Sequence, residues 1–147
     1  MSDEFDRDLA TARDSLASAR EGLLAVVSAL AEDDLTRARR GGWSVRKVLE
    51  HVIQSEWLYS RLATHLKGST SAEEPEPAAF ASVAEAAEQL DAVRAALLAA
   101  IDGVDEESFY RLQTVGHEEY SVLSLLENVA LHDREHAPQV QEILAAS

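Results

Sequence analysis

The chain has 147 residues, of which 46% are hydrophobic and none is cysteine, and its formal net charge at pH 7 is −14. A chain of this length can bury a real core as one domain. The lack of cysteine excludes disulfides, cysteine–zinc sites and catalysis by a thiol of the protein itself. The acidic excess repels phosphate backbones, so we expect no nucleic-acid partner.

The N-terminal segment, MSDEFDRDLA, is acidic and polar, unlike a secretory signal. No apolar run approaches the roughly 20 residues that a membrane-spanning helix needs. A chain without cysteine is also compatible with a reducing compartment. We therefore expect a cytoplasmic protein with no membrane partner.

Apolar residues at alternating spacings of four and three predict a first long helix over residues 3–31. Gly41-Gly42 then breaks the chain. Ser44 is predicted to cap a second helix, which runs to Lys67 and ends at Gly68. Residues 68–81 are small, acidic and proline-containing, which predicts a long loop.

Ser82 and Glu85 have the spacing of a capping box, which predicts the start of a third helix. Gly103 is predicted to close that helix. Residues 104–120 form a shorter, irregular stretch with a helical turn expected over residues 105–112.

Ser121 is predicted to cap the fourth long helix. Pro138 lies inside this helix and removes a backbone donor, so we expect a kink just after His136. Four long amphipathic helices with few strand signals predict an all-α protein, a four-helix bundle. Because the chain shows no internal repeat and no boundary, residues 1–147 are expected to form a single domain.

Three histidines fall on or beside the inward faces of the predicted helices. His132 and His136 are four residues apart on the fourth helix, so their Cβ atoms lie about 5–6 Å apart. His51 lies at the edge of the apolar face of the second helix. A buried polar group without a partner costs about 1–3 kcal/mol. One divalent metal shared by all three would remove that cost and leave a coordination position open, as in catalytic sites.

The helical geometry gives the histidines unequal environments. His136 is expected to be the most buried, with His132 and His51 at the margin where a pocket can open. His65 lies 14 residues after His51 on the same helix, about 21 Å away, which is too far to share an ion. His117 lies in the stretch before the fourth helix and is expected to be a solvated loop residue.

Asp133 also projects inward and has two interpretations that the sequence leaves open. It could hold a liganding imidazole or act as a base near the metal. It could equally form an ion pair with an arginine of a neighbouring helix. Three other acidic residues are expected to lie on solvated faces: Glu50, Glu56 and Glu135.

Two short motifs recur together in a known family. Gly42-Trp43-Ser44 followed by His51-Val52-Ile53, and then the late His132-Asp133-Arg134-Glu135-His136, resembles the DinB-like superfamily of DinB/YfiT-like four-helix bundles. The resemblance covers essentially the whole chain. It implies a bundle with a long connection between the second and third helices. It also implies a divalent metal site formed by His51, His132 and His136, and a homodimer.

The resemblance also implies a range of activities on small-molecule substrates. Members include metal-dependent hydrolases and transferases that use low-molecular-weight thiols such as mycothiol or bacillithiol, which here would have to be external. Asp133 would be the candidate catalytic base. Imidazole suits several metals, so we expect zinc or nickel, with manganese or iron as alternatives. The alternatives to an enzyme are a non-catalytic, stress-related protein that binds a small ligand or a metal, and a bundle whose histidines bind no metal.

Overall fold

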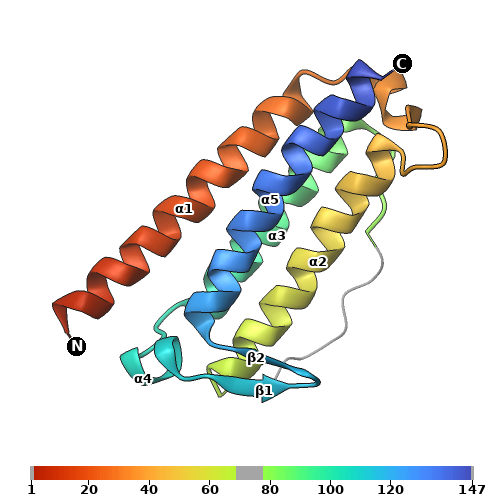
Figure 1. Ribbon diagram of the computed structural model, residues 1–147. Coiled ribbons are helices and arrows are strands. Elements are labelled where there is room, and N and C mark those ends of the chain that lie inside the picture. The colour runs from red at the N-terminus through yellow and green to blue at the C-terminus, as the bar shows by residue number, and fades with distance from the viewer. Residues whose placement is uncertain (1, 69–77, 147) are drawn as a thin grey trace.

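Four long helices run side by side in the computed structural model of the protein, which describes residues 2–68 and 78–146 (Figure 1). They are α1 (Asp3–Ser28), α2 (Val45–Leu66), α3 (Val83–Ile101) and α5 (Val122–Ala145). A short 3₁₀ helix, η1 (Glu32–Thr36), follows α1. Between α3 and α5 lie the short helix α4 (Glu106–Tyr110) and a hairpin of β1 (Gln113–Val115) and β2 (Glu118–Tyr120). The predicted all-α four-helix bundle is confirmed.

Each long helix begins at a serine whose hydroxyl accepts a hydrogen bond from the N–H three residues further on: Ser2, Ser44, Ser82 and Ser121. This bond satisfies one of the backbone donors that the first turn leaves unpaired. Glu85, however, does not complete a capping box with Ser82. Its carboxylate accepts from the N–H of Ala81 at 2.6 Å instead. At the other end of α2, Gly68 has φ +91°, a left-handed conformation that favours glycine and ends the helix.

The stretch before α5 is more regular than the sequence predicts. Asp105 caps α4 by accepting from the N–H of Ser108 at 2.7 Å. The hairpin turns at Gly116, whose φ is +66°. Its strands are three residues each, too short for an alternating pattern to be visible in the sequence. In the long predicted loop, residues 69–77 lie outside the described residues. Helix α5 continues through Pro138, and the predicted kink stays a prediction.

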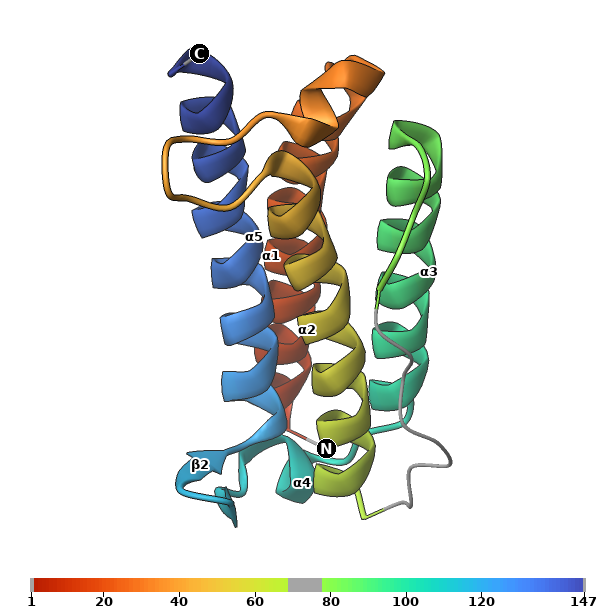
Figure 2. The same ribbon diagram turned by 90° about the vertical axis from the view of Figure 1, so that its right-hand side faces the viewer.

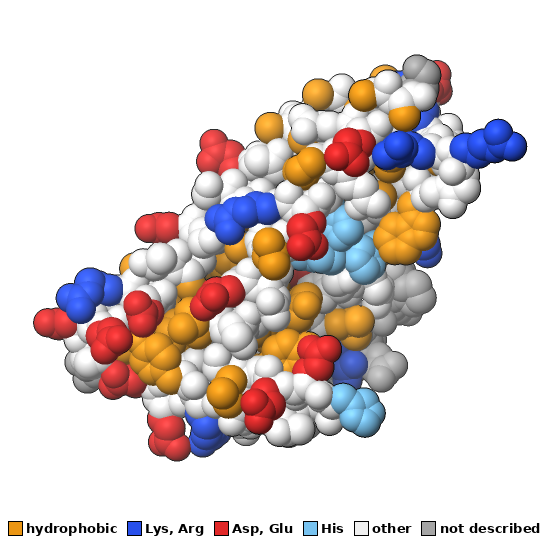
Figure 3. All heavy atoms as spheres, in the orientation of Figure 1, with side chains coloured by type: hydrophobic (Ala, Val, Ile, Leu, Met, Phe, Trp, Pro, Cys, Tyr) orange, Lys and Arg blue, Asp and Glu red, His pale blue; other side chains and the backbone are white. Residues whose placement is uncertain are grey.

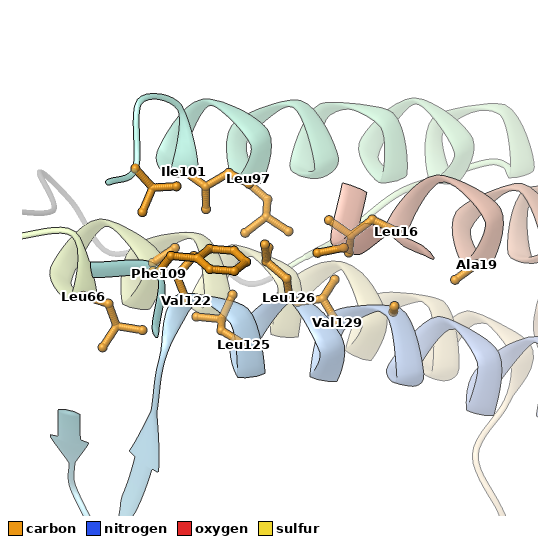
Figure 4. Packing of buried hydrophobic residues seen from close by; sticks show 14 of the residues in the cluster. Leu16, Ala19, Leu66, Leu97, Ile101, Phe109, Val122, Leu125, Leu126 and Val129 are labelled. Carbon is orange, nitrogen blue, oxygen red and sulfur yellow. The ribbon is translucent and has the colours of Figure 1, made fainter. Parts of the chain in front are cut away.

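The buried apolar residues form two clusters at opposite ends of the bundle. Figure 4 shows the cluster nearer the hairpin, in which Phe109 and Leu125 join buried residues of α1 and α3 such as Leu16 and Leu97. The other cluster contains Leu49 and Leu90. The view in Figure 2 shows α3 on the side of α2 away from α5. Within the described residues, no helix combines the length and apolar character needed to cross a membrane.

A layer of four charged side chains lies between the two apolar clusters, and each long helix contributes one member: Arg20, Glu56, Arg94 and Asp133. Arg20 contacts Glu56 at 2.5 Å and Asp133 at 2.9 Å. Arg94 contacts the same two carboxylates at 2.8 and 3.1 Å. Each guanidinium also donates to a main-chain carbonyl of the opposite helix. We refer to these residues as the charge layer.

Glu56 is only 2% exposed, so the prediction that it is solvated is wrong. Its position on α2 faces both arginines, and the two ion pairs offset the cost of removing the carboxylate from water. Burial alone would lower the pKa of Arg20, but the charges and hydrogen bonds of Glu56 and Asp133 outweigh burial and raise it. Arg20 therefore keeps its positive charge in the interior.

Candidate metal site

The three predicted histidines converge where α2 and α5 pack together. The Nε2 atom of His132 lies 3.0 Å from Nε2 of His51 and 2.8 Å from Nε2 of His136. All three ligand atoms lie within 4.8 Å of one another, so the group could hold a metal ion. Figure 3 shows a cluster of histidine side chains reaching the molecular surface.

The contacts between these nitrogens fit a shared cation better than they fit hydrogen bonds. A neutral imidazole nitrogen either donates one hydrogen or accepts through one lone pair. Because Nε2 of His132 faces two other Nε2 atoms, the two contacts cannot both be ordinary hydrogen bonds. Metal–imidazole bonds of about 2.0–2.1 Å place two bound nitrogens about 2.9 Å apart at right angles and about 3.4 Å apart at tetrahedral angles. The two separations from Nε2 of His132 lie near the right-angle value.

Burial favours the neutral form of two candidate ligands, His132 and His51. It lowers the pKa of His132 to about 4, with further lowering from His136 and His51 and a smaller opposing effect of Asp133. Burial also lowers the pKa of His51, and the charges of His136 and Lys47 lower it further by smaller amounts. A neutral imidazole is the form that binds a metal.

The lowered pKa of His132 predicts that the metal-free protein loses stability as the solution is acidified. In the unfolded chain the pKa of His132 is 6.5, whereas in the folded chain it is about 4, so between these values the unfolded chain binds more protons. The contribution of this group is therefore fully present above pH 6.5 and is lost as the pH falls toward 4. Urea unfolding across this window should show a shallower loss for His132→Ala than for the parent protein. A parallel loss in both would contradict the assignment, and His65→Ala should behave like the parent.

Gln139 fixes the tautomer of one candidate ligand. Its side-chain Oε1 lies 2.5 Å from Nδ1 of His136, and a carbonyl oxygen can only accept. Nδ1 must therefore carry the hydrogen, which leaves the lone pair of Nε2 directed toward the other two histidines. Sequence reasoning missed Gln139. The available signal was its position three residues after His136, on the same side of the helix.

Replacing Gln139 with alanine should weaken metal binding about tenfold, because outer partners of metal ligands contribute 10–100-fold to affinity. Competition with a chromogenic chelator measures the effect. Gln141→Ala is the matched control, since Gln141 is an exposed glutamine on the same helix. Equal affinity of the two variants would contradict the role of Gln139.

The structure tests one of the two interpretations of Asp133. Its Oδ2 accepts from both Arg20 and Arg94, its Oδ1 accepts from Arg20, and the residue is 1% exposed. The predicted ion pair with an arginine of a neighbouring helix is thus confirmed. No contact tests a role as catalytic base, which stays a prediction.

The remaining histidine predictions have mixed outcomes. His65 and His117 are exposed, and His117 lies in the turn of the hairpin. His136 is half-buried like its two partners, so the expectation that it is the most buried of the three stays a prediction. Its ring turns toward His132 and Gln139 along the surface of α5.

The fold and the site together define a class of protein: a four-helix bundle with a three-histidine group supplied by α2 and α5. The model of the DinB superfamily matches residues 7–140, and the chain belongs to this family. Among solved structures, the chain is similar to TT2238, described as a four-helix bundle protein. The two share 25% identity with a TM-score of 0.68, over 89% of this chain and 95% of the other. No curated protein matches the chain.

Proposed function

We propose that the protein binds one divalent metal ion through the Nε2 atoms of His51, His132 and His136, and that it is a metal-dependent enzyme acting on a small molecule. The reaction would be hydrolysis, or transfer with an external low-molecular-weight thiol such as mycothiol or bacillithiol. The observation that carries the proposal is the approach of the three Nε2 atoms, at 2.8 and 3.0 Å.

A divalent metal bound there supplies a Lewis acid with an open coordination position. The surrounding residues of the protein would hold and orient the three histidines. Gln139 keeps the proton of His136 on Nδ1, and the rings of Trp43 and His51 make a T-shaped contact with 5.1 Å between their centroids. Half-burial of the histidines leaves room for a small molecule to approach from the surface. We propose zinc or nickel as the metal, with manganese or iron as alternatives.

The setting of the protein is also part of the proposal. The family resemblance supports a homodimer, and the net charge of −14 supports a function without nucleic acid. We place the protein in the cytoplasm, without a membrane partner. Because the chain contains no cysteine, any thiol must come from a second molecule.

A second candidate is a non-catalytic protein that binds a metal or a small ligand, for example in a stress response. One observation favours it. Asp133, the inward carboxylate beside His132, has both oxygens engaged by guanidinium groups, the arrangement of a structural ion pair.

Metal content tests the proposal directly. Protein purified without an affinity tag should contain about one equivalent of metal by mass spectrometry. Added zinc or nickel at about 100-fold above Kd should stabilise the fold by about 2.7 kcal/mol, a shift of several degrees in Tm. Less than about a tenth of an equivalent, with no Tm shift for zinc, nickel, manganese or iron, would contradict metal binding. Metal binding without turnover of ester, amide or thiol-transfer substrates would favour the second candidate.

A further inference from the structure

A surface cleft of about 480 Å³ opens beside His51. Its lining comes mainly from one face of α2, together with Trp43 just before that helix. The volume is in the range of small-molecule sites. Because His51 is part of the lining, a molecule held in the cleft lies next to the three-histidine group.

The cleft has two large apolar residues that are open to solvent. Trp43 is 44% exposed and Leu58 is 51% exposed, and both belong to the lining. In Figure 3 a large hydrophobic side chain borders the histidine cluster. Exposed apolar side chains that flank a cleft are characteristic of binding sites. An apolar or aromatic group between Trp43 and Leu58 would cover this surface.

The same lining contains one cation and one anion that do not neutralise each other. The Nζ atom of Lys47 lies 5.7 Å from the centroid of the Trp43 ring. Among the described residues, Lys47 has no carboxylate and Glu50 no cationic group within ion-pairing distance. Lys47 and Glu50 are three residues apart on α2, a spacing at which opposite charges can pair, but here the two side chains do not form an ion pair. Both charges are therefore available to a ligand.

We propose that this cleft binds a zwitterion of the α-amino-acid type with an aromatic or apolar side chain. Lys47 pairs with its carboxylate, Glu50 pairs with its ammonium group, and its side chain lies between Trp43 and Leu58. Glu50 and the net charge of −14 disfavour ligands with several negative charges. The inference rests on the proposed function only in placing the ligand beside the metal.

A series of ligands with the same ring tests the charge requirement. L-Phenylalanine carries both charges, 3-phenylpropanoate only the carboxylate and 2-phenylethylamine only the ammonium group. Isothermal titration of zinc-loaded and metal-free protein should show L-phenylalanine binding roughly fivefold more tightly than either analogue, the upper range for ion pairs open to water. Equal affinity for all three ligands would overturn the proposal.

Two variants assign each charge to its residue. Lys47→Met should bind L-phenylalanine and 2-phenylethylamine equally, and Glu50→Gln should bind L-phenylalanine and 3-phenylpropanoate equally. Lys67→Met and Glu127→Gln are the matched controls and should keep the parent preference. If all variants retain that preference, the proposal fails.

Metal content, measured on every variant, separates the two proposals. Normal metal content without a preference for the zwitterion contradicts only the ligand assignment. A zwitterion preference in a protein that takes up no metal contradicts only the proposed metal function.

Discussion

Replacing His132 with alanine should abolish metal binding. Its Nε2 atom is within 3.0 Å of the other two Nε2 atoms, so its removal leaves His51 and His136 without the nitrogen that links them. We expect a loss of more than about 100-fold in affinity, beyond the 10–100-fold typical of an outer partner. Chelator competition and the metal-dependent rise in Tm both report the loss. His136→Ala should behave in the same way.

His65→Ala is the control for this experiment. His65 is a histidine of α2, like His51, but it is exposed and outside the cluster. The substitution should leave metal affinity unchanged. If His132→Ala and His65→Ala lose metal to the same extent, or neither does, the assignment of the site is wrong.

Replacing Glu56 with alanine should lower the free energy of unfolding by about 3–5 kcal/mol. The carboxylate accepts from both Arg20 and Arg94, and its removal leaves two buried guanidinium groups with Asp133 as the single remaining carboxylate. Urea denaturation measures the loss. If the alanine variant does not fold, Glu56→Gln keeps the shape of the side chain and should still show a large part of the destabilisation.

Two comparisons show whether the effect comes from uncompensated charge. Glu127→Ala removes an exposed glutamate and should change stability by less than about 0.5 kcal/mol. Replacing all four charged residues by leucine or methionine should cost less than Glu56→Ala alone, because no buried charge is left unpaired. A larger loss in the fourfold variant would contradict this explanation.

The candidate site was predictable because it depends on local helical geometry. His132 and His136 share a face of one helix, and His51 lies on the inward side of another, so any bundle that pairs these helices brings the three rings together. Gln139 was missed because its role depends on the rotamer of His136. A glutamine three residues from a histidine is common on helices that bind nothing.

The full set of ion pairs in the charge layer could not be predicted from sequence patterns. Arg20 and Arg94 interrupt apolar faces, and each alone resembles a surface arginine. Only the arrangement of four helices reveals that they share Glu56 and Asp133. The helix caps, in contrast, depend on residues within one turn, and the serine caps at Ser44, Ser82 and Ser121 were predicted correctly.

The charge layer also fixes how far each helix of the bundle can shift lengthwise along its neighbours. Apolar layers can re-pair when a helix slides along its neighbour, but a slide of one turn, about 5.4 Å, separates a charged residue from both of its partners. Glu56 and Asp133 thereby fix the lengthwise alignment of α2 and α5. The histidines are divided between these same two helices, so their separation is set by ion pairs in the interior of the bundle. The spacing of the candidate metal ligands thus depends on Glu56 and Asp133, which are not part of the three-histidine group.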